Sequence, residues 1–438
     1  MRYNKKVRKS YGERRAKTRG IAKFRERGNS MDRVILHCDC NSFFASVELL
    51  AHPELREVPV AVGHDDNSRH GIILAKNEAA KKFGIVTAET VWQARRKCPA
   101  LILLPPHHDL YREYSKKLNE IYGRYTDLVE PFGIDESWLD VTGSLHLFAQ
   151  SGAELADVIR ATVKKELGLT ISVGVSYNKI YAKLGSDYKK PDATTVITRE
   201  NCREIVYPLR ATAMIFVGRA AEQQLRSMGI CTLGELASAD EARLTQVFGK
   251  MGQQLRRYAA GEDESPVAPQ HEPEQVKSIG NGITFKRDLV TPADLRTGTG
   301  YLADEVAARL RAKGFKCTAV QVMIKDTALK SISRQKTLPR ETDLASEITE
   351  AAVQLVRANW PAGKPIRALT VTAERLVTGP VPCQMGLFAE QETAPPDPRR
   401  EKLERTMDAL RQKYGQTAVA AGSLLGNDLG LEDFHKKD

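Results

Sequence analysis

Long apolar runs are absent from this sequence of 438 residues. Stretches such as Leu101 to Leu104 are far shorter than the roughly 18 apolar residues that a membrane-spanning helix needs. The first residues also lack the apolar core of a secretory signal peptide. We therefore expect no membrane association and a location in the cytoplasm.

Cysteine motifs for metal binding are missing as well. The seven cysteines, an odd number, stand at positions 38, 40, 98, 202, 231, 317 and 383, and none of them forms a CxxC pair. This spacing gives no zinc cluster and no disulfide framework, so we expect reduced thiols. Because residues i and i+2 of a strand share one face, Cys38 and Cys40 are expected to pack on the face opposite to Asp39.

Positive charge is concentrated in one part of the chain. The net charge is +11, but residues 1–30 alone carry twelve Lys or Arg against two Glu. Few large apolar residues interrupt this segment, which predicts a disordered basic extension. Two explanations are open: Met31 is the true start, or the segment is an arm that holds phosphates electrostatically.

The rest of the chain has the composition of a folded, soluble protein. With 42% hydrophobic and 28% charged residues, its length predicts about three domains. Residues 273–378 hold 17 Lys or Arg against 11 Asp or Glu, which is typical of a surface that binds duplex nucleic acid.

Two adjacent carboxylates, Asp135 and Glu136, interrupt an apolar stretch from Phe132 to Thr142. An acidic pair is weak evidence alone, because 55 acidic residues in 438 give about seven such pairs by chance. Here, however, the flanking residues predict strands. Two buried carboxylates repel each other unless a cation neutralises them, so this stretch predicts a divalent metal site.

A third carboxylate, Asp39, ends the apolar run that begins at Val34. If the three acids converge at strand ends, they can hold two Mg²⁺ ions that bridge a triphosphate. Such ions lower the pKa of an attacking hydroxyl and stabilise the pyrophosphate leaving group. The predicted chemistry is nucleotidyl transfer.

The segments 34–48 and 132–142 resemble the palm motifs of Y-family DNA polymerases, most closely those of the DNA polymerase IV branch. The resemblance implies an α+β multidomain fold, the right-handed polymerase with palm, small fingers, thumb and little finger. It implies that Asp39, Asp135 and Glu136 are catalytic. It also implies that two Mg²⁺ ions are held by these side chains and by the backbone of Cys40.

The same resemblance implies domain boundaries. The expected segments are a basic extension 1–30, a palm 31–41 and 107–197, fingers 42–106, a helix-hairpin-helix thumb 198–264, a linker 265–274, a little finger 275–378 and a tail 379–438. Within the little finger, apolar alternation predicts strands at 320–324 and 369–373, and helices at 301–310 and 348–356. A charged amphipathic helix is predicted from Arg399 to Tyr414.

Residues for the incoming nucleotide are also implied by the resemblance. Those expected at the triphosphate are Ser42, Phe43, Lys81 and Lys190. Phe44 matches the steric gate, an aromatic ring that leaves no room for a 2′-hydroxyl and so selects deoxyribonucleotides. Leu74 and Ala75 are expected over the nascent base pair, where small side chains tolerate distorted templates.

At four positions the sequence departs from the family pattern. Lys81 stands where an Arg is common, and it keeps the charge but loses the bidentate fork. Glu78 replaces a common Tyr and is expected to repel phosphates, while Asn41 replaces a second Asp. Phe216 replaces the first glycine of the thumb hairpin, so its phosphate site cannot be carried over.

After the expected little finger, the tail contains a Gln-x-x-Leu-Phe peptide. Gln384, Leu387 and Phe388 resemble the short peptide that docks in the sliding clamp, the β clamp of bacteria. The Gln hydrogen-bonds at the rim of the pocket while the two apolar side chains fill it.

The sequence therefore predicts a translesion DNA polymerase of low fidelity without proofreading. The implied partners are primer-template DNA, deoxynucleoside triphosphates and the sliding clamp, and the enzyme is expected to be a nucleoid-associated monomer. Two rivals share parts of this pattern: a nucleotidyl cyclase with the same palm chemistry, and a non-catalytic DNA-binding protein. Primer extension with Mg²⁺ separates the three.

Overall fold

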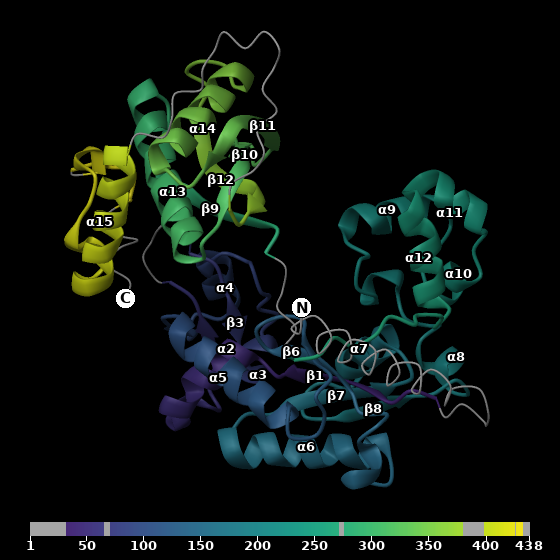
Figure 1. Cartoon of the computed structure of the whole chain (residues 1–438). Coiled ribbons are helices and arrows are strands. Elements are labelled where there is room, and N and C mark those ends of the chain that lie inside the picture. Colours follow the sequence, from purple (N-terminus) through teal and green to yellow (C-terminus); the bar gives the residue numbers. More distant parts are fainter. Residues whose placement is uncertain (1–31, 65–70, 271–275, 380–397, 425, 432–438) are drawn as a thin grey trace, which may run out of the picture. The chain divides into compact units, whose positions relative to one another are not determined.

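The computed structural model describes residues 32–64, 71–270, 276–379, 398–424 and 426–431. The described residues fall into two compact units: residues 32–64 and 72–270 make up the first, and residues 276–379, 398–424 and 426–431 belong to the second, with the elements of each labelled in Figure 1. The first unit contains several hydrophobic cores, and the division of the chain into about three domains stays a prediction. The mixed α+β class is confirmed. No helix in the described ranges is long and apolar enough to cross a membrane.

A five-stranded sheet is the centre of the first unit. Its order is β5 (Val129–Pro131), β6 (Glu136–Asp140), β1 (Ile35–Cys40), β7 (Ile171–Ser176) and β8 (Thr194–Ile197). The pairs are antiparallel except for β7 and β8. All six residues of β1 are buried, as expected for an apolar strand covered on both faces.

Helices cover both faces of this sheet. On one face, α5 (His108–Tyr122) and α6 (Gly152–Leu167) pack against Cys38 and Cys40. On the other, α7 (Lys179–Tyr188) approaches so closely that a Cβ on Gly174 would lie 1.9 Å from Ala182 O. Asp39 faces α7, so the prediction that the two cysteines lie opposite to it is confirmed.

The first unit also contains a smaller sheet with helices beside it. Its strands, in order, are β3 (Ala75–Lys76), β2 (Val60–Val62) and β4 (Ile102–Leu104), with α2 (Phe43–Ala51), α3 (Glu78–Lys81) and α4 (Val91–Lys97) beside them. Asn77 begins α3, since its Oδ1 accepts hydrogen bonds from Ala80 N and Val60 N.

The remaining helices of the first unit follow one another along the chain. They are α8 (Cys202–Ile205), α9 (Arg219–Ser227), α10 (Leu233–Ala237), α11 (Glu241–Phe248) and α12 (Lys250–Ala259). Phe216, just before α9, has a φ of 73°, the left-handed conformation that glycine adopts without cost. The described part of the expected linker is anchored, because Val267 is buried and Gln270 N donates to Asp127 O.

The second unit is a sheet covered by helices. Its elements along the chain are β9 (Ser278–Leu289), α13 (Pro292–Ala312), β10 (Lys316–Lys325), β11 (Ser331–Thr342), α14 (Ala345–Asn359) and β12 (Ile366–Val377). The antiparallel sheet has the order β11-β10-β12-β9. The strands and helices predicted within residues 301–373 are all confirmed.

The chain returns to this unit after β12. The predicted charged helix is α15 (Pro398–Tyr414), and Arg311 of α13 forms ion pairs with Glu404 and Asp408 on it. Further along, three leucines join the core of the unit: Leu424, Leu429 and Leu431. The predicted clamp peptide 384–388 lies outside the described residues.

Candidate active site

A polar pocket opens where β1 and β6 present their carboxylates. Its lining residues are Asp39, Cys40, Ser42, Phe43, Phe44, Leu74, Ala75, Lys76, Lys81, Thr87, Ile134, Asp135, Glu136 and Lys190. Every residue that the sequence predicted for catalysis, metal, triphosphate and sugar selection is in this set. The pocket thus joins segments that are far apart in the sequence.

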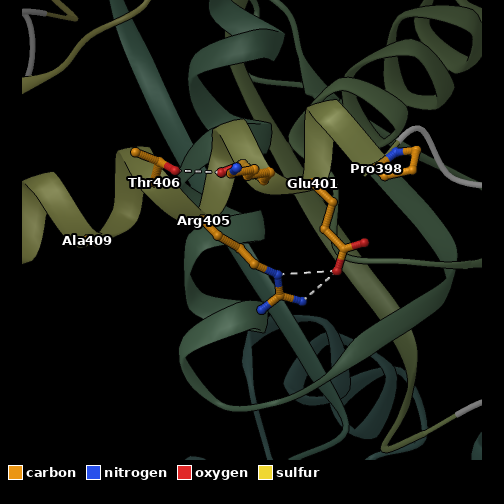
Figure 2. A pocket seen from close by; sticks show the side chains of 6 residues that line it. Pro398, Glu401, Arg405, Thr406 and Ala409 are labelled. Atoms are coloured by element: carbon orange, nitrogen blue, oxygen red, sulfur yellow. Dashed lines mark hydrogen bonds and ion pairs between the residues drawn. The ribbon is translucent and has the colours of Figure 1, made fainter.

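A second hollow, shown in Figure 2, has a different character. It lies along α15, and its side chains largely satisfy one another: Glu401 Oε1 accepts from Arg405, and Thr406 donates to the backbone of Lys402. It therefore has no convergent groups for chemistry.

The register of two strands brings the carboxylates together. In the antiparallel pair of β1 and β6, Asp39 lies directly opposite Glu136. Just beyond it, Cys40 N donates to Asp135 O at 3.1 Å. Ligand atoms of Asp39 and Glu136 lie within 4.8 Å of each other, together with one of His37. This is a separation that one metal ion can span.

The electrostatics make the two neighbouring acids unequal. Burial, reinforced by the carboxylates of Asp39 and Glu136, raises the pKa of Asp135 to about 6. Burial also opposes ionisation of Glu136, but His37 and Lys183 outweigh it and lower its pKa to about 2. Burial is the largest cause of the upward shift, because it disfavours the charged form of Asp135.

Two lysines of the α7 region reach these acids. Lys190 Nζ lies 2.7 Å from Asp39 Oδ2 and 2.8 Å from Asp187 Oδ1. Lys183 Nζ lies 3.2 Å from Asp39 Oδ2 and 2.8 Å from Glu136 Oε2. The sequence predicted Lys190, which follows the end of α7, but not Lys183, which lies within that helix.

His37 was also missed. It is fully buried, and its Nδ1 lies 2.8 Å from Ser186 Oγ. Its Nε2 faces Glu136 Oε2 at 3.3 Å, and the same oxygen lies 2.8 Å from Lys183 Nζ. The signal that the sequence offered was a histidine at position 37, inside the apolar run that begins at Val34.

These residues fit a hard divalent cation. Carboxylate oxygens are the ligands that Mg²⁺ prefers. Asp39 and Glu136 offer such oxygens within 4.8 Å of each other, and Asp135 lines the same pocket. The ammonium groups that lie against Asp39 and Glu136 show that this site attracts positive charge.

The proposed steric gate is held by aromatic stacking. The ring of Phe44 lies flat on Tyr111, with centroids 4.0 Å apart and planes 11° apart, and edge-on to His108. Tyr111 is fixed in turn because its hydroxyl donates to Glu48. The neighbouring ring of Phe43 is buried, so Phe43 contributes to the pocket through its backbone in the first turn of α2.

On the opposite wall, a lysine and a glutamate are paired. Lys81 Nζ lies 2.5 Å from Glu78 Oε1, and Ser42 Oγ donates to the same oxygen at 3.3 Å. Lys76, which the sequence did not single out, also lines the pocket and donates to Thr87 Oγ1. Lys76 and Lys81 thus bring two ammonium groups to the pocket, and Glu78 pairs with the ammonium group of Lys81.

Comparisons with known proteins identify the family of this chain. The chain matches the impB/mucB/samB family over residues 38–187 and the C-terminal domain of that family over residues 276–387. DNA polymerase IV of Acetivibrio thermocellus is 45% identical over 404 residues, covering 92% of this chain and 99% of the relative. DNA polymerase IV 1 of Bacillus subtilis is 36% identical over 394 residues, covering 90% and 93%.

A solved Y-family DNA polymerase chimera shares the fold, with a TM-score of 0.69 and 22% identity, and covers 79% of this chain and 100% of its own. The chain therefore belongs to the impB/mucB/samB family, the Y-family of DNA polymerases. Within that family it resembles the proteins called DNA polymerase IV.

Proposed function

We propose that this protein is a DNA polymerase of the DNA polymerase IV type, which extends a primer 3′ end across damaged templates. The observation that carries the proposal is the convergence of Asp39, Asp135 and Glu136 in one pocket. These side chains and the backbone of Cys40 would hold two Mg²⁺ ions. When bound, such ions supply charge stabilisation for nucleotidyl transfer from a triphosphate.

The lysines of the pocket bind the triphosphate in this proposal. Lys190 exchanges its contact with Asp39 for phosphate oxygens, and its compact ammonium suits a flexible, multiply charged tail. Lys81 contributes from α3, while Ser42 and Phe43 offer the first turn of α2. A helix N-terminus favours negative charge.

Phe44 excludes the 2′-hydroxyl in this assignment. Its ring lines the pocket and is backed by Tyr111, so it cannot withdraw easily when a ribose enters. Leu74 and Ala75 line the pocket with small surfaces and leave a nascent base pair loosely enclosed. A loose enclosure discriminates weakly between correct and distorted pairs.

Low fidelity and the lack of proofreading remain part of the proposal. The loose enclosure by Leu74 and Ala75 supports the low fidelity.

DNA is the proposed partner of both units. In this assignment the first unit comprises palm, fingers and thumb, and the second unit is the little finger whose basic surface follows the duplex backbone. The sliding clamp is the proposed partner of Gln384, Leu387 and Phe388. The C-terminal family match extends to residue 387, which supports a family role for this segment. We propose that the polymerase acts as a monomer in the cytoplasm, at the nucleoid.

Primer extension on a synthetic template with Mg²⁺ tests the proposal. The wild-type protein should extend the primer, and the double variant Asp135→Asn with Glu136→Gln should lose at least about 10³-fold in rate, because transition-state charge is no longer stabilised. Asp127→Asn, an exposed acid outside the pocket, is the matched control and should remain active.

The two rival functions give other results. A nucleotidyl cyclase would convert a free nucleoside triphosphate without primer or template. A non-catalytic DNA-binding protein would retain the primer without extending it. Either result would overturn the proposal.

A further inference from the structure

Lys183 occupies the position between the two opposed carboxylates. Its ammonium lies 3.2 Å from Asp39 Oδ2 and 2.8 Å from Glu136 Oε2, while Asp187 Oδ2 lies 3.4 Å away on its own helix. Only 10% of its side chain is exposed. A lysine so deeply buried costs free energy unless it is paired, so its place here is set by the acids around it.

The fold holds Lys183 against the sheet. Its helix, α7, contacts β7 at Gly174, where any side chain would collide with the backbone of Ala182. That close approach brings the Lys183 side chain over the end of β1, where Asp39 lies. Lys190 also reaches Asp39, but its side chain is 32% exposed, and its second ion-pair partner among the described residues is Asp187 rather than Glu136.

His37 is the other basic side chain beside Glu136. Its Nδ1 lies 2.8 Å from Ser186 Oγ, and its Nε2 lies 3.3 Å from Glu136 Oε2, farther than Lys183 Nζ at 2.8 Å. His37 pairs with Glu136, whereas Lys183 contacts both Asp39 and Glu136. Lys183 is therefore the cation that lies between the two acids.

We propose that Lys183 is a positioning residue, a counter-ion built into the chain that holds Asp39 and Glu136 facing each other before a metal ion arrives. The inference rests on the proposed function of these two acids as metal ligands. Without Lys183, the two carboxylates repel each other across the β1–β6 pair, and the metal-free site opens. When Mg²⁺ is present, the charge of the bound ion neutralises the repulsion between the two carboxylates in place of Lys183.

Thermal unfolding in EDTA and in excess Mg²⁺ tests this inference without any measurement of catalysis. We expect Lys183→Met to lower Tm in EDTA by about 4 °C or more, and Mg²⁺ to recover at least half of that loss. Lys183→Arg keeps the charge and should retain most of the wild-type Tm in EDTA. Hydrogen exchange of β1 and β6 should report the same Mg²⁺-dependent loss and recovery at the site.

The matched control is Lys179→Met. Lys179 lies one turn earlier on α7, is similarly buried and pairs with Glu130 at 2.6 Å, away from the two acids. Its loss should lower Tm equally in EDTA and in Mg²⁺. If Lys183→Met behaves in the same way, or does not lower Tm, the inference is overturned.

If Lys183→Met does not fold in either condition, the double variant with Glu136→Gln decides. Removing the second charge should restore folding, and failure to do so would overturn the inference. The two proposals remain separable. If Mg²⁺ restores the Tm of Lys183→Met but the wild-type protein extends no primer, the proposed polymerase function is wrong and the role of Lys183 stands. If the wild-type protein extends a primer but Mg²⁺ does not restore the Tm of Lys183→Met, only the role of Lys183 is wrong.

Discussion

The stacked ring of Phe44 predicts a change in sugar selection. Phe44→Ala should raise the incorporation of ribonucleotides relative to deoxyribonucleotides by about 10²-fold, because it removes the surface that collides with the 2′-hydroxyl. The ratio of the two specificity constants measures the effect. Phe148→Ala, an exposed aromatic packed edge-on against Tyr125, is the control. An unchanged ratio in Phe44→Ala would refute the gate assignment.

Glu78 predicts an effect on nucleotide affinity. Since its carboxylate pairs with Lys81 in the pocket wall, Glu78→Gln should free the ammonium for phosphate and lower KM for deoxynucleotides by about three- to tenfold. The measurement is steady-state single-nucleotide insertion at low and high salt, because the effect should weaken as salt rises. Glu113→Gln breaks a comparable exposed pair with Lys117 on α5 and should leave KM unchanged. A higher KM in Glu78→Gln would show that Glu78 helps binding.

At the scale of single elements, the start of α13 predicts acid sensitivity. Asp294 Oδ2 accepts from Thr291 N and Val290 N, and Arg287 contacts both of its carboxylate oxygens. Arg287, together with these amides, lowers the pKa of Asp294 well below its usual value. The folded state then binds fewer protons than the unfolded state, so this contribution is present at neutral pH and is lost as pH falls below about 4.

Asp294→Asn should therefore destabilise the second unit by about 1 to 2 kcal/mol at pH 7 and by less at pH 3. Hydrogen exchange of α13 as a function of pH measures the difference. Glu305→Gln, farther along the same helix, is the control and should show no such dependence. An equal loss at both pH values would contradict the assignment.

Apolar periodicity made many of these elements predictable. The strands beside Asp39 and Glu136 were predicted from their apolar residues. The metal site was predicted because a charge buried at the end of an apolar strand needs a cation to neutralise it. Lys183 and His37 could not be found in this way. A lysine within a helix usually faces water, and only the close contact at Gly174 turns Lys183 inward.

The local pairings of Glu78 also lay beyond the sequence. The expectation was repulsion between Glu78 and phosphates, and its pairing with Lys81 depends on side-chain placement over one turn of α3. Likewise, the close contact of residues 265–270 with the first unit depends on hydrogen bonds between residues distant in sequence, such as Gln270 to Asp127. Composition alone suggested a free linker there.

At the scale of the whole molecule, we expect the stability of the second unit to depend on the C-terminal segment that packs against it. Deleting residues 398–438 should lower the Tm of this unit by at least several degrees, because Arg311 loses two partners and three leucines leave the core. Calorimetry of the full chain and the deletion variant measures the change. An unchanged transition would show that the segment contributes little to stability.

Deleting only residues 384–388 should impair the response to a sliding clamp and leave stability unchanged. Stimulation of primer extension by a sliding clamp should fall at least tenfold, since the peptide supplies the anchors, while extension without the clamp and Tm should remain as in the wild type. Replacing Gln391, Thr393 and Ala394 by Gly is the control within the same segment. Equal losses with and without the clamp would argue against docking.

The central place of β1 has a consequence for how the protein is made. On the ribosome β1 emerges early, but its two neighbours, β6 and β7, follow only after residues 136 and 171 have been synthesised. Until then an apolar strand has both edges unpaired, which is the situation that promotes aggregation and recruits chaperones. A nascent polypeptide of this protein can thus complete its central sheet only after the long stretch between β1 and β7 has been translated.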